Sequence, residues 1–135
     1  MKIKTTTIYK KNMIFETARL HTRKLEQTDE YGFYDLMSNS NVMNLIPQDV
    51  LNKEESNLKL RELIGLERTS ETKIWALCMD DSNEFIGIAG FLKNNENQAE
   101  IAYRIREQYW EKGYGTEIAK GLLDFHYFLE NLQFQ

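Results

Sequence analysis

Two glycines in the last third of the chain, Gly113 and Gly115, have the spacing of a loop that binds phosphate. An alternating apolar run precedes them and an amphipathic run follows, so they lie where a predicted strand passes into a predicted helix. Glycine adopts backbone angles that other residues avoid and lets a ligand approach the main chain. The first amides of a helix have no partner within it and attract anions. Residues 112–116 are therefore predicted to hold the diphosphate of a nucleotide-like cofactor, with a simple turn as the alternative.

The composition is that of an ordinary globular protein and disfavours several classes of function. The chain has 135 residues, 41% hydrophobic and 28% charged, which fits one domain with a sizeable core. A net charge of −4 disfavours nucleic-acid binding, which usually needs a basic surface. The single cysteine, Cys78, excludes an intramolecular disulfide and a Cys-rich zinc site, and two isolated histidines do not make a metal site. The absence of a possible intramolecular disulfide makes the reducing cytoplasm the expected compartment. No apolar run approaches the ~20 residues of a membrane span, and the sequence predicts no metal, membrane or nucleic-acid partner.

Strands and helices can be predicted on both sides of the glycine loop. Strands are predicted at residues 15–25, 73–79, 84–92 and 98–106, and helices at 28–38, at 53–68 and from Thr116 onward. Short polar turns join the last three strands, which favours an antiparallel meander. The order β-α-α-β-β-β-α predicts an α+β fold with a largely antiparallel sheet flanked by helices. Residues 1–12 are basic without the apolar core of a signal peptide and are predicted to be an N-terminal extension of a domain at 13–135.

Four segments carry a resemblance to a known family. Residues 17–23 read Thr-Ala-Arg-Leu-His-Thr-Arg, 41–47 read Asn-Val-Met-Asn-Leu-Ile-Pro, 99–105 read Ala-Glu-Ile-Ala-Tyr-Arg-Ile, and 109–117 read Tyr-Trp-Glu-Lys-Gly-Tyr-Gly-Thr-Glu. In order and spacing they resemble the GNAT superfamily of acyl-CoA-dependent N-acetyltransferases, most closely the ribosomal-protein N-acetyltransferase branch. The family's diphosphate loop reads Gln/Arg-x-x-Gly-x-Gly/Ala. Trp110 stands where many members have Gln or Arg, and Trp is common there in this branch.

The resemblance implies acetyl-CoA as the cofactor and names the residues that would bind it. They are Tyr103 and Ile105 for the pantetheine arm, and Trp110, Lys112, Gly113, Tyr114, Gly115 and Thr116 in and around the diphosphate loop. Similar family members often carry a Glu at the position of Glu100, which makes this residue the candidate general base. A solvent-exposed strand residue without a catalytic role is the alternative for Glu100.

The function implied by the resemblance is acetyl transfer to a primary amine by direct attack on the thioester. The acceptor is either a protein N-terminal α-amine or a small amine. The family continues past the last helix predicted here, so the resemblance implies a GNAT-type fold that lacks the last strands and helix. The fourth predicted strand would then expose an edge that favours pairing with a second copy of the chain. A catalytically degenerate module that binds CoA or a partner protein is the alternative.

Overall fold

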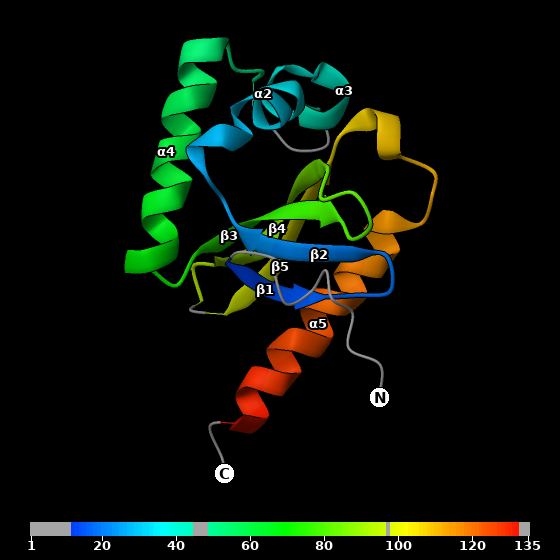
Figure 1. Cartoon of the computed structure of the whole chain (residues 1–135). Coiled ribbons are helices and arrows are strands. Elements are labelled where there is room, and N and C mark those ends of the chain that lie inside the picture. Colours follow the sequence, from blue (N-terminus) through cyan, green and yellow to red (C-terminus); the bar gives the residue numbers. More distant parts are fainter. Residues whose placement is uncertain (1–11, 45–48, 97, 133–135) are drawn as a thin grey trace.

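The computed structural model describes residues 12–44, 49–96 and 98–132 and contains one five-stranded sheet (Figure 1). Its strands are β1 (Met13–Glu16), β2 (Leu20–Lys24), β3 (Lys73–Met79), β4 (Phe85–Lys93) and β5 (Ala99–Ile105). They lie in the order β1-β2-β3-β4-β5, and each pairs antiparallel with its neighbour. The predicted α+β class, antiparallel sheet and meander of the last three strands are confirmed.

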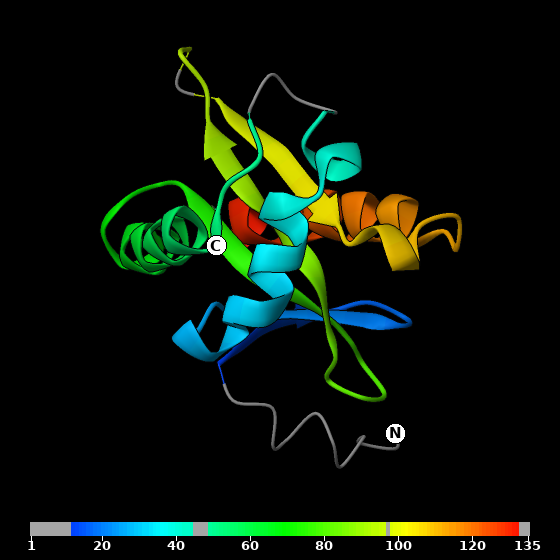
Figure 2. The same cartoon turned by 90° about the horizontal axis from the view of Figure 1, so that it is seen from above.

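Helices cover both faces of the sheet. They are α2 (Glu30–Ser38), α3 (Ser40–Met43), α4 (Lys53–Thr69) and α5 (Tyr114–Leu132), with short 3-10 turns η1 (Gln27–Asp29) and η2 (Glu107–Tyr109). Figures 1 and 2 show α2, α3 and α4 on one face and α5 on the other. A capping box between Asn52 and Glu55 starts α4, because each side chain binds the other residue's backbone amide.

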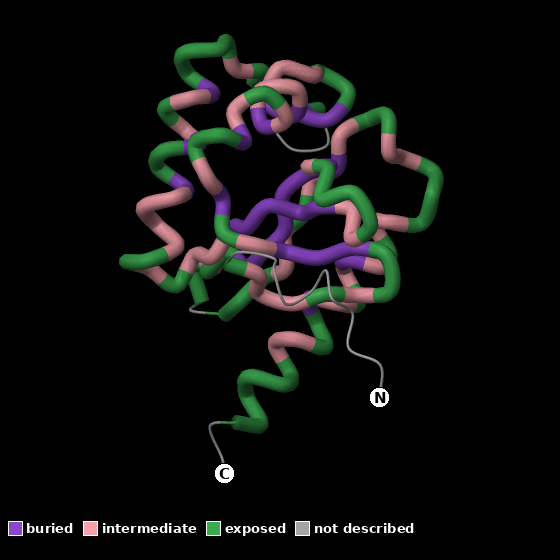
Figure 3. Tube along the Cα trace, in the orientation of Figure 1, coloured by how far each residue is buried: buried purple, intermediate pink, exposed green. Residues whose placement is uncertain are grey.

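The sheet separates two hydrophobic cores. On one face, Phe33 and Leu36 of α2 and Leu60 of α4 are fully buried against strand residues. On the other face, Ile118 and Leu122 of α5 are fully buried against the sheet. Figure 3 shows the buried strands between the helices and the largely exposed second half of α5. Among the described residues, no helix is both long and apolar enough to cross a bilayer.

The first predicted strand, 15–25, is wrong as a single element, because the chain reverses within it. Strands β1 and β2 form a hairpin in which Phe15 pairs with Thr22. The Thr17 amide donates to the Leu20 carbonyl at 2.8 Å and closes the turn, while the Thr17 hydroxyl binds both Leu20 and Glu117. The contact with Glu117 lies outside the segment, so the segment's own apolar pattern could not indicate the turn.

The other element boundaries are close to those predicted. The strand at 73–79 is found as predicted, and the strands predicted at 84–92 and 98–106 are β4 and β5. The last helix begins at Tyr114, two residues earlier than predicted. The predicted N-terminal extension, residues 1–12, lies outside the described residues except for Asn12.

A buried ion pair joins β2 to the start of the first helices. The Arg23 guanidinium donates two hydrogen bonds to the Asp29 carboxylate, at 2.9 and 2.7 Å, and this contact raises the pKa of Arg23. The Glu26 amide donates to the same carboxylate at 2.9 Å. Asp29 is buried, with a side chain only 6% exposed. The carboxylate thus fixes the direction in which the chain leaves the sheet for α2.

We expect Asp29→Asn to lower the free energy of unfolding by about 3 kcal/mol, because the partly buried Arg23 loses its counter-charge. Urea unfolding followed by circular dichroism measures the change. Asp124→Asn on the exposed face of α5 is the matched control. Equal stability of the Asp29 and Asp124 variants would contradict a structural role for the pair.

Candidate cofactor and acceptor site

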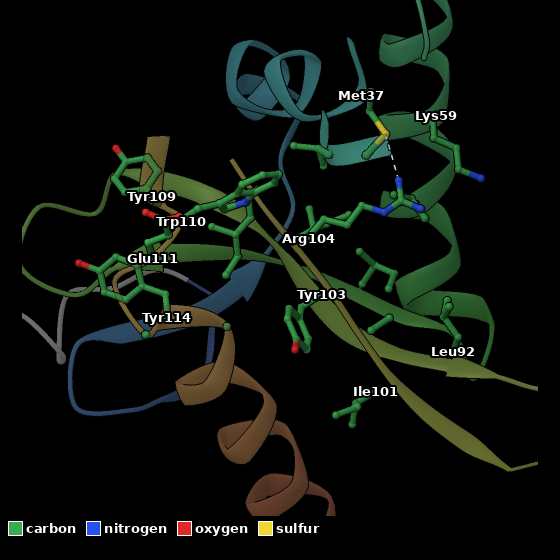
Figure 4. A pocket seen from close by; sticks show the side chains of 18 residues that line it. Met37, Lys59, Leu92, Ile101, Tyr103, Arg104, Tyr109, Trp110, Glu111 and Tyr114 are labelled. Carbon is green, nitrogen blue, oxygen red and sulfur yellow. Dashed lines mark hydrogen bonds between the residues drawn. The ribbon is translucent and has the colours of Figure 1, made fainter. Parts of the chain in front are cut away.

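A cavity of about 720 Å³ follows strand β5 (Figure 4). It is lined by five consecutive residues of this strand, 101–105. Successive side chains of a strand point to opposite faces, so the cavity reaches both faces of the sheet around the outer edge of β5. In Figure 4, Tyr103 and Arg104 leave the strand on opposite sides. One half of the cavity therefore adjoins α5, and the other adjoins α2, α3 and α4.

The half next to α5 contains the glycine loop. Its lining residues outside the strand are Tyr109, Trp110, Glu111, Gly113, Tyr114 and Gly115. Gly113 has a φ of +83°, which suits glycine, and Glu111 has a φ of +64°, which few side chains adopt. A Cβ on Gly115 would lie 3.4 Å from the Tyr103 ring and 3.9 Å from the Ile105 side chain. Because Gly115 has no side chain, the backbone of the loop stays accessible between β5 and α5.

Helix α5 directs its first amides toward this loop. The Glu117 amide donates to the Gly113 carbonyl at 3.1 Å, which is the first hydrogen bond of the helix. The amides of Tyr114, Gly115 and Thr116 precede this bond. No earlier turn of the helix supplies carbonyls that could accept hydrogen bonds from them. Together with the helix dipole they form a site that favours an anion such as a diphosphate.

Trp110 connects the loop to β5 and to both cores. Its indole nitrogen donates to the Ile105 carbonyl at 2.7 Å, and its ring packs against both hydrophobic clusters. The hydrogen bond satisfies the last carbonyl of the strand just where the chain turns away from the sheet. Trp110 therefore has a positioning role that does not depend on direct contact with a ligand.

A carboxylate in the first turn of α5 anchors the loop to the β1–β2 turn. Glu117 accepts hydrogen bonds from the Thr17 hydroxyl, from the Arg19 amide at 2.9 Å and from the Arg19 Nε at 2.7 Å. The Arg19 Nη1 donates to the Lys112 carbonyl at 3.0 Å, and the guanidinium lies 4.5 Å from the centre of the Tyr114 ring. Burial would raise the pKa of Glu117, but these hydrogen bonds outweigh it and hold the pKa below 4.5.

The half of the cavity next to α2, α3 and α4 is mostly apolar. Its lining residues are Met37, Val42, Lys59, Leu63, Ile74, Ile88, Leu92, Ala102 and Arg104. The Arg104 guanidinium lies 3.2 Å from the Met43 sulfur and 3.7 Å from the Met37 sulfur, and burial lowers the pKa of Arg104. This half has the shape and polarity to receive an acceptor molecule with an apolar body.

Two polar side chains, Glu107 and Arg106, attach the turn after β5 to neighbouring elements. The Glu107 carboxylate accepts hydrogen bonds from Asn39 at 2.9 Å and from Asn41 at 3.1 Å, which lower its pKa. Arg106 donates to Asp35 at 2.8 Å and to the Phe85 carbonyl at 2.8 Å. The two halves of the cavity are thereby held in a defined relation.

The structure places six of the eight predicted cofactor residues on the cavity. They are Tyr103, Ile105, Trp110, Gly113, Tyr114 and Gly115. Lys112 and Thr116 are exposed beside the loop, and the Lys112 carbonyl is bound by Arg19. Whether these residues bind the cofactor stays a prediction.

Glu100, the predicted base, is exposed and does not line the cavity. Its carboxylate accepts a hydrogen bond from Asn94 at 3.1 Å. Ala102, two residues further along the same face of β5, does line the cavity. Glu100 therefore lies just beyond the end of the half of the cavity next to α2, α3 and α4, and its catalytic role stays a prediction.

Sequence reasoning missed the anchoring residues Arg19 and Glu117, and the cavity cation Arg104. Arg19 lies in the segment 17–23 and Glu117 in the segment 109–117, and both segments carry the family resemblance. The presence of both segments in one chain was the available signal that these two residues contact each other. For Arg104, the alternation of β5 shows only that it faces away from Tyr103. In the described part of the chain, no three His, Cys, Asp or Glu side chains gather to hold a metal ion.

Comparison with known proteins decides the family. The model of the acetyltransferase (GNAT) domain matches residues 19–134. The chain belongs to the GNAT acetyltransferase family. It is 28% identical over 121 residues to the uncharacterized N-acetyltransferase YnaD of Bacillus subtilis, covering 89% of this chain and 69% of that protein. The p20 N-acetyltransferase of Bacillus licheniformis is 26% identical, with 86% of this chain and 67% of that protein covered.

Solved structures of GNAT acetyltransferases have the same fold. A family member from Bacillus anthracis superposes with a TM-score of 0.75 at 25% identity, over 88% of this chain and 68% of that one. The ribosomal-protein acetyltransferase RimL has a TM-score of 0.69 at 19% identity, over 88% and 66%, a likeness of fold alone. The predicted GNAT family and fold are confirmed, and the chain spans about two thirds of the length of these relatives.

Glu117 predicts a pH-dependent contribution to stability. Its folded pKa lies below 4.5, so the contribution is present above pH 4.5 and is lost as the pH falls through the folded pKa. At pH 7, Glu117→Gln should lower the free energy of unfolding by about 1 to 2 kcal/mol. Thermal and urea unfolding from pH 7 to pH 3 measure the effect. A difference from the wild type that did not shrink below pH 4.5 would contradict this role.

Proposed function

We propose that this GNAT protein transfers an acetyl group from acetyl-CoA to a primary amine. The observation that carries the proposal is a continuous cavity that joins the glycine loop at the start of α5 to both faces of β5. Such a cavity lets a cofactor approach from the α5 side and an acceptor from the α2–α4 side. The two would meet at the edge of one strand, which satisfies the proximity that group transfer needs.

The residues of this chain fit acetyl-CoA. The first amides of α5 and the open backbone at Gly113 and Gly115 suit its diphosphate. On the outer edge of β5, the backbone polar groups of Tyr103 and the amide of Ile105 suit the amide-containing pantetheine arm, while the Ile105 carbonyl is bound by Trp110. Solved structures with the same fold support this assignment, since RimL has been seen with coenzyme A and the acetyltransferase MccE with acetyl-CoA and AMP.

The transfer joins the acceptor nitrogen to the thioester carbonyl carbon and breaks the carbon–sulfur bond. The amine loses a proton, and the thiol of CoA is released. A backbone amide of β5 is the proposed donor to the carbonyl oxygen as negative charge develops on it. The amine must be neutral to attack: near pH 7 roughly one-tenth of an α-amine is neutral, but only about one in two thousand lysine side chains. A base therefore contributes more for a lysine-like amine than for an N-terminal one.

Glu100 is the proposed base, acting directly or through a water molecule. Its position beyond Ala102 on the acceptor face of β5 supports a route through water rather than direct contact. The rival proposal is a catalytically degenerate protein that binds CoA or a partner without turnover. The exposed carboxylate bound by Asn94 is the observation that favours this rival.

The acceptor is proposed to be a protein N-terminal α-amine or a small amine. Pairing with a second copy of the chain remains a prediction. It is supported by the position of β5 at the end of the strand order among the described residues, and by exposed apolar side chains on α5. Leu123, Tyr127 and Phe128 of α5 are more than half exposed.

Acetyl-CoA should bind the wild-type protein, and Gly115→Ala should weaken this binding by at least about tenfold because a methyl group would fill the bare backbone of the loop. The methyl contacts Tyr103 at an ordinary distance, so the variant should fold. Gly65→Ala is the matched control, since nothing lies within 4 Å of its added methyl group in α4. Isothermal titration calorimetry measures the affinities. Unchanged binding in the Gly115 variant would place the diphosphate elsewhere.

Glu100→Gln should lower kcat/KM at pH 7 by about 100-fold and leave acetyl-CoA affinity unchanged. Thiol release in the presence of a panel of small amines and N-terminal peptides measures activity. Glu96→Gln, in the neighbouring β4–β5 turn, is the control. Wild-type activity in the Glu100 variant would make Glu100 a surface residue, and acetyl-CoA binding without turnover of any amine would favour the degenerate alternative.

A further inference from the structure

A positive charge is set into the apolar wall of the acceptor half of the cavity. Arg104 extends from β5 toward α2 and α3, where one guanidinium nitrogen lies near the sulfur of Met37 (Figure 4). The same nitrogen lies near the sulfur of Met43. Val42 and Leu63 line the cavity nearby and are buried. An arginine keeps its charge in such surroundings. The cavity thus combines an apolar surface with one strongly directional cation.

The geometry of an arginine allows it to hold protein contacts and a ligand together. A guanidinium carries five N–H donors in a fixed planar fork. The fork matches the two oxygens of a carboxylate, which it binds through parallel hydrogen bonds. The protein itself uses this pairing at Arg23, whose two donors meet both oxygens of Asp29 at 2.9 and 2.7 Å.

The other charges on the cavity are differently placed. Lys59 contributes to the wall, but its ammonium group lies 3.6 Å from the Glu62 carboxylate and points away from Arg104 in Figure 4. Glu111 lies at the other end, in the turn before the glycine loop. Arg104 is therefore the charge best placed to select the acceptor.

We propose that the acceptor is a small primary amine that carries a carboxylate, and that Arg104 binds this carboxylate. The inference rests on the proposed function and specifies its substrate class. The apolar body of the acceptor would pack against Met37, Val42 and Leu63. Because Arg104 lies between Tyr103 and Ile105 in β5, a carboxylate held there leaves the amine near the strand edge proposed to bind the thioester.

Arg104 is then a specificity-determining residue. A partly buried cation that pairs with the carboxylate of a ligand discriminates against a neutral ligand of the same shape, because the neutral ligand loses this pairing without a gain in packing. The affinity for an acceptor would depend mainly on its negative charge and only modestly on the size of its apolar part.

The test compares binding of 3-phenylpropionate with that of 3-phenylpropionamide, which has the same apolar body without the charge. Titrations of the full chain are followed by NMR, with and without acetyl-CoA. The carboxylate should bind at least about tenfold more tightly than the amide. Arg104→Met should remove this preference, and Arg104→Lys should retain part of it. Arg61→Met on the exposed side of α4 removes the same charge away from the cavity and should leave the preference unchanged.

Equal binding of the two probes, no carboxylate binding at millimolar concentration, or a preference that survives Arg104→Met would overturn the inference. If Arg104→Met does not fold, the relative affinity of the two probes for the wild-type protein and for Arg104→Lys still tests the inference. Acetyl-CoA affinity is measured on the same samples. Acetyl-CoA binding without a carboxylate preference overturns this inference alone, whereas a carboxylate preference without acetyl-CoA binding overturns the proposed function alone.

Discussion

The contacts of one carboxylate determine the geometry of the candidate cofactor loop. Glu117 accepts hydrogen bonds from Thr17 and Arg19, so the first turn of α5 is attached to the turn of the β1–β2 hairpin. Arg19 then holds the Lys112 carbonyl just before Gly113. A loop that must point several amides at one ligand needs such a fixed support, because each added degree of freedom would be lost again on binding. The N-terminal hairpin therefore supports the candidate cofactor site, although no residue of it lines the cavity.

The position of β5 at the edge of the sheet is the second feature that determines the shape of the cavity. Its residues face a separate core on each side, and Trp110 touches both of them. Hydrogen bonds from Asn39 to Glu107 and from Arg106 to Asp35 hold the turn after β5 against α2 and the start of α3. The proposed cofactor and acceptor sides of the cavity thus share one strand and the turn that follows it.

The sequence predicted those features that depend on local patterns. Alternating apolar residues located β3, β4 and β5, and the glycine spacing located the loop, because strand periodicity and turn chemistry are properties of adjacent residues. It did not predict the β1–β2 reversal, because Thr17 is held partly by Glu117, which lies 100 residues away. Arg104 was missed for the same reason, because the residues around it come from α2 and α3. The alternation of the strand indicates only on which face of the sheet Arg104 lies.

The place of Trp110 also has a spectroscopic consequence. The chain contains two tryptophans, and Trp75 is buried in the core beneath α5. Trp110 is partly exposed at the cavity, with its indole fixed by the Ile105 carbonyl. A ligand that enters the cavity alters the polarity around one indole and leaves the other shielded. The intrinsic fluorescence of the protein therefore contains a constant component and a component that reports occupancy at β5.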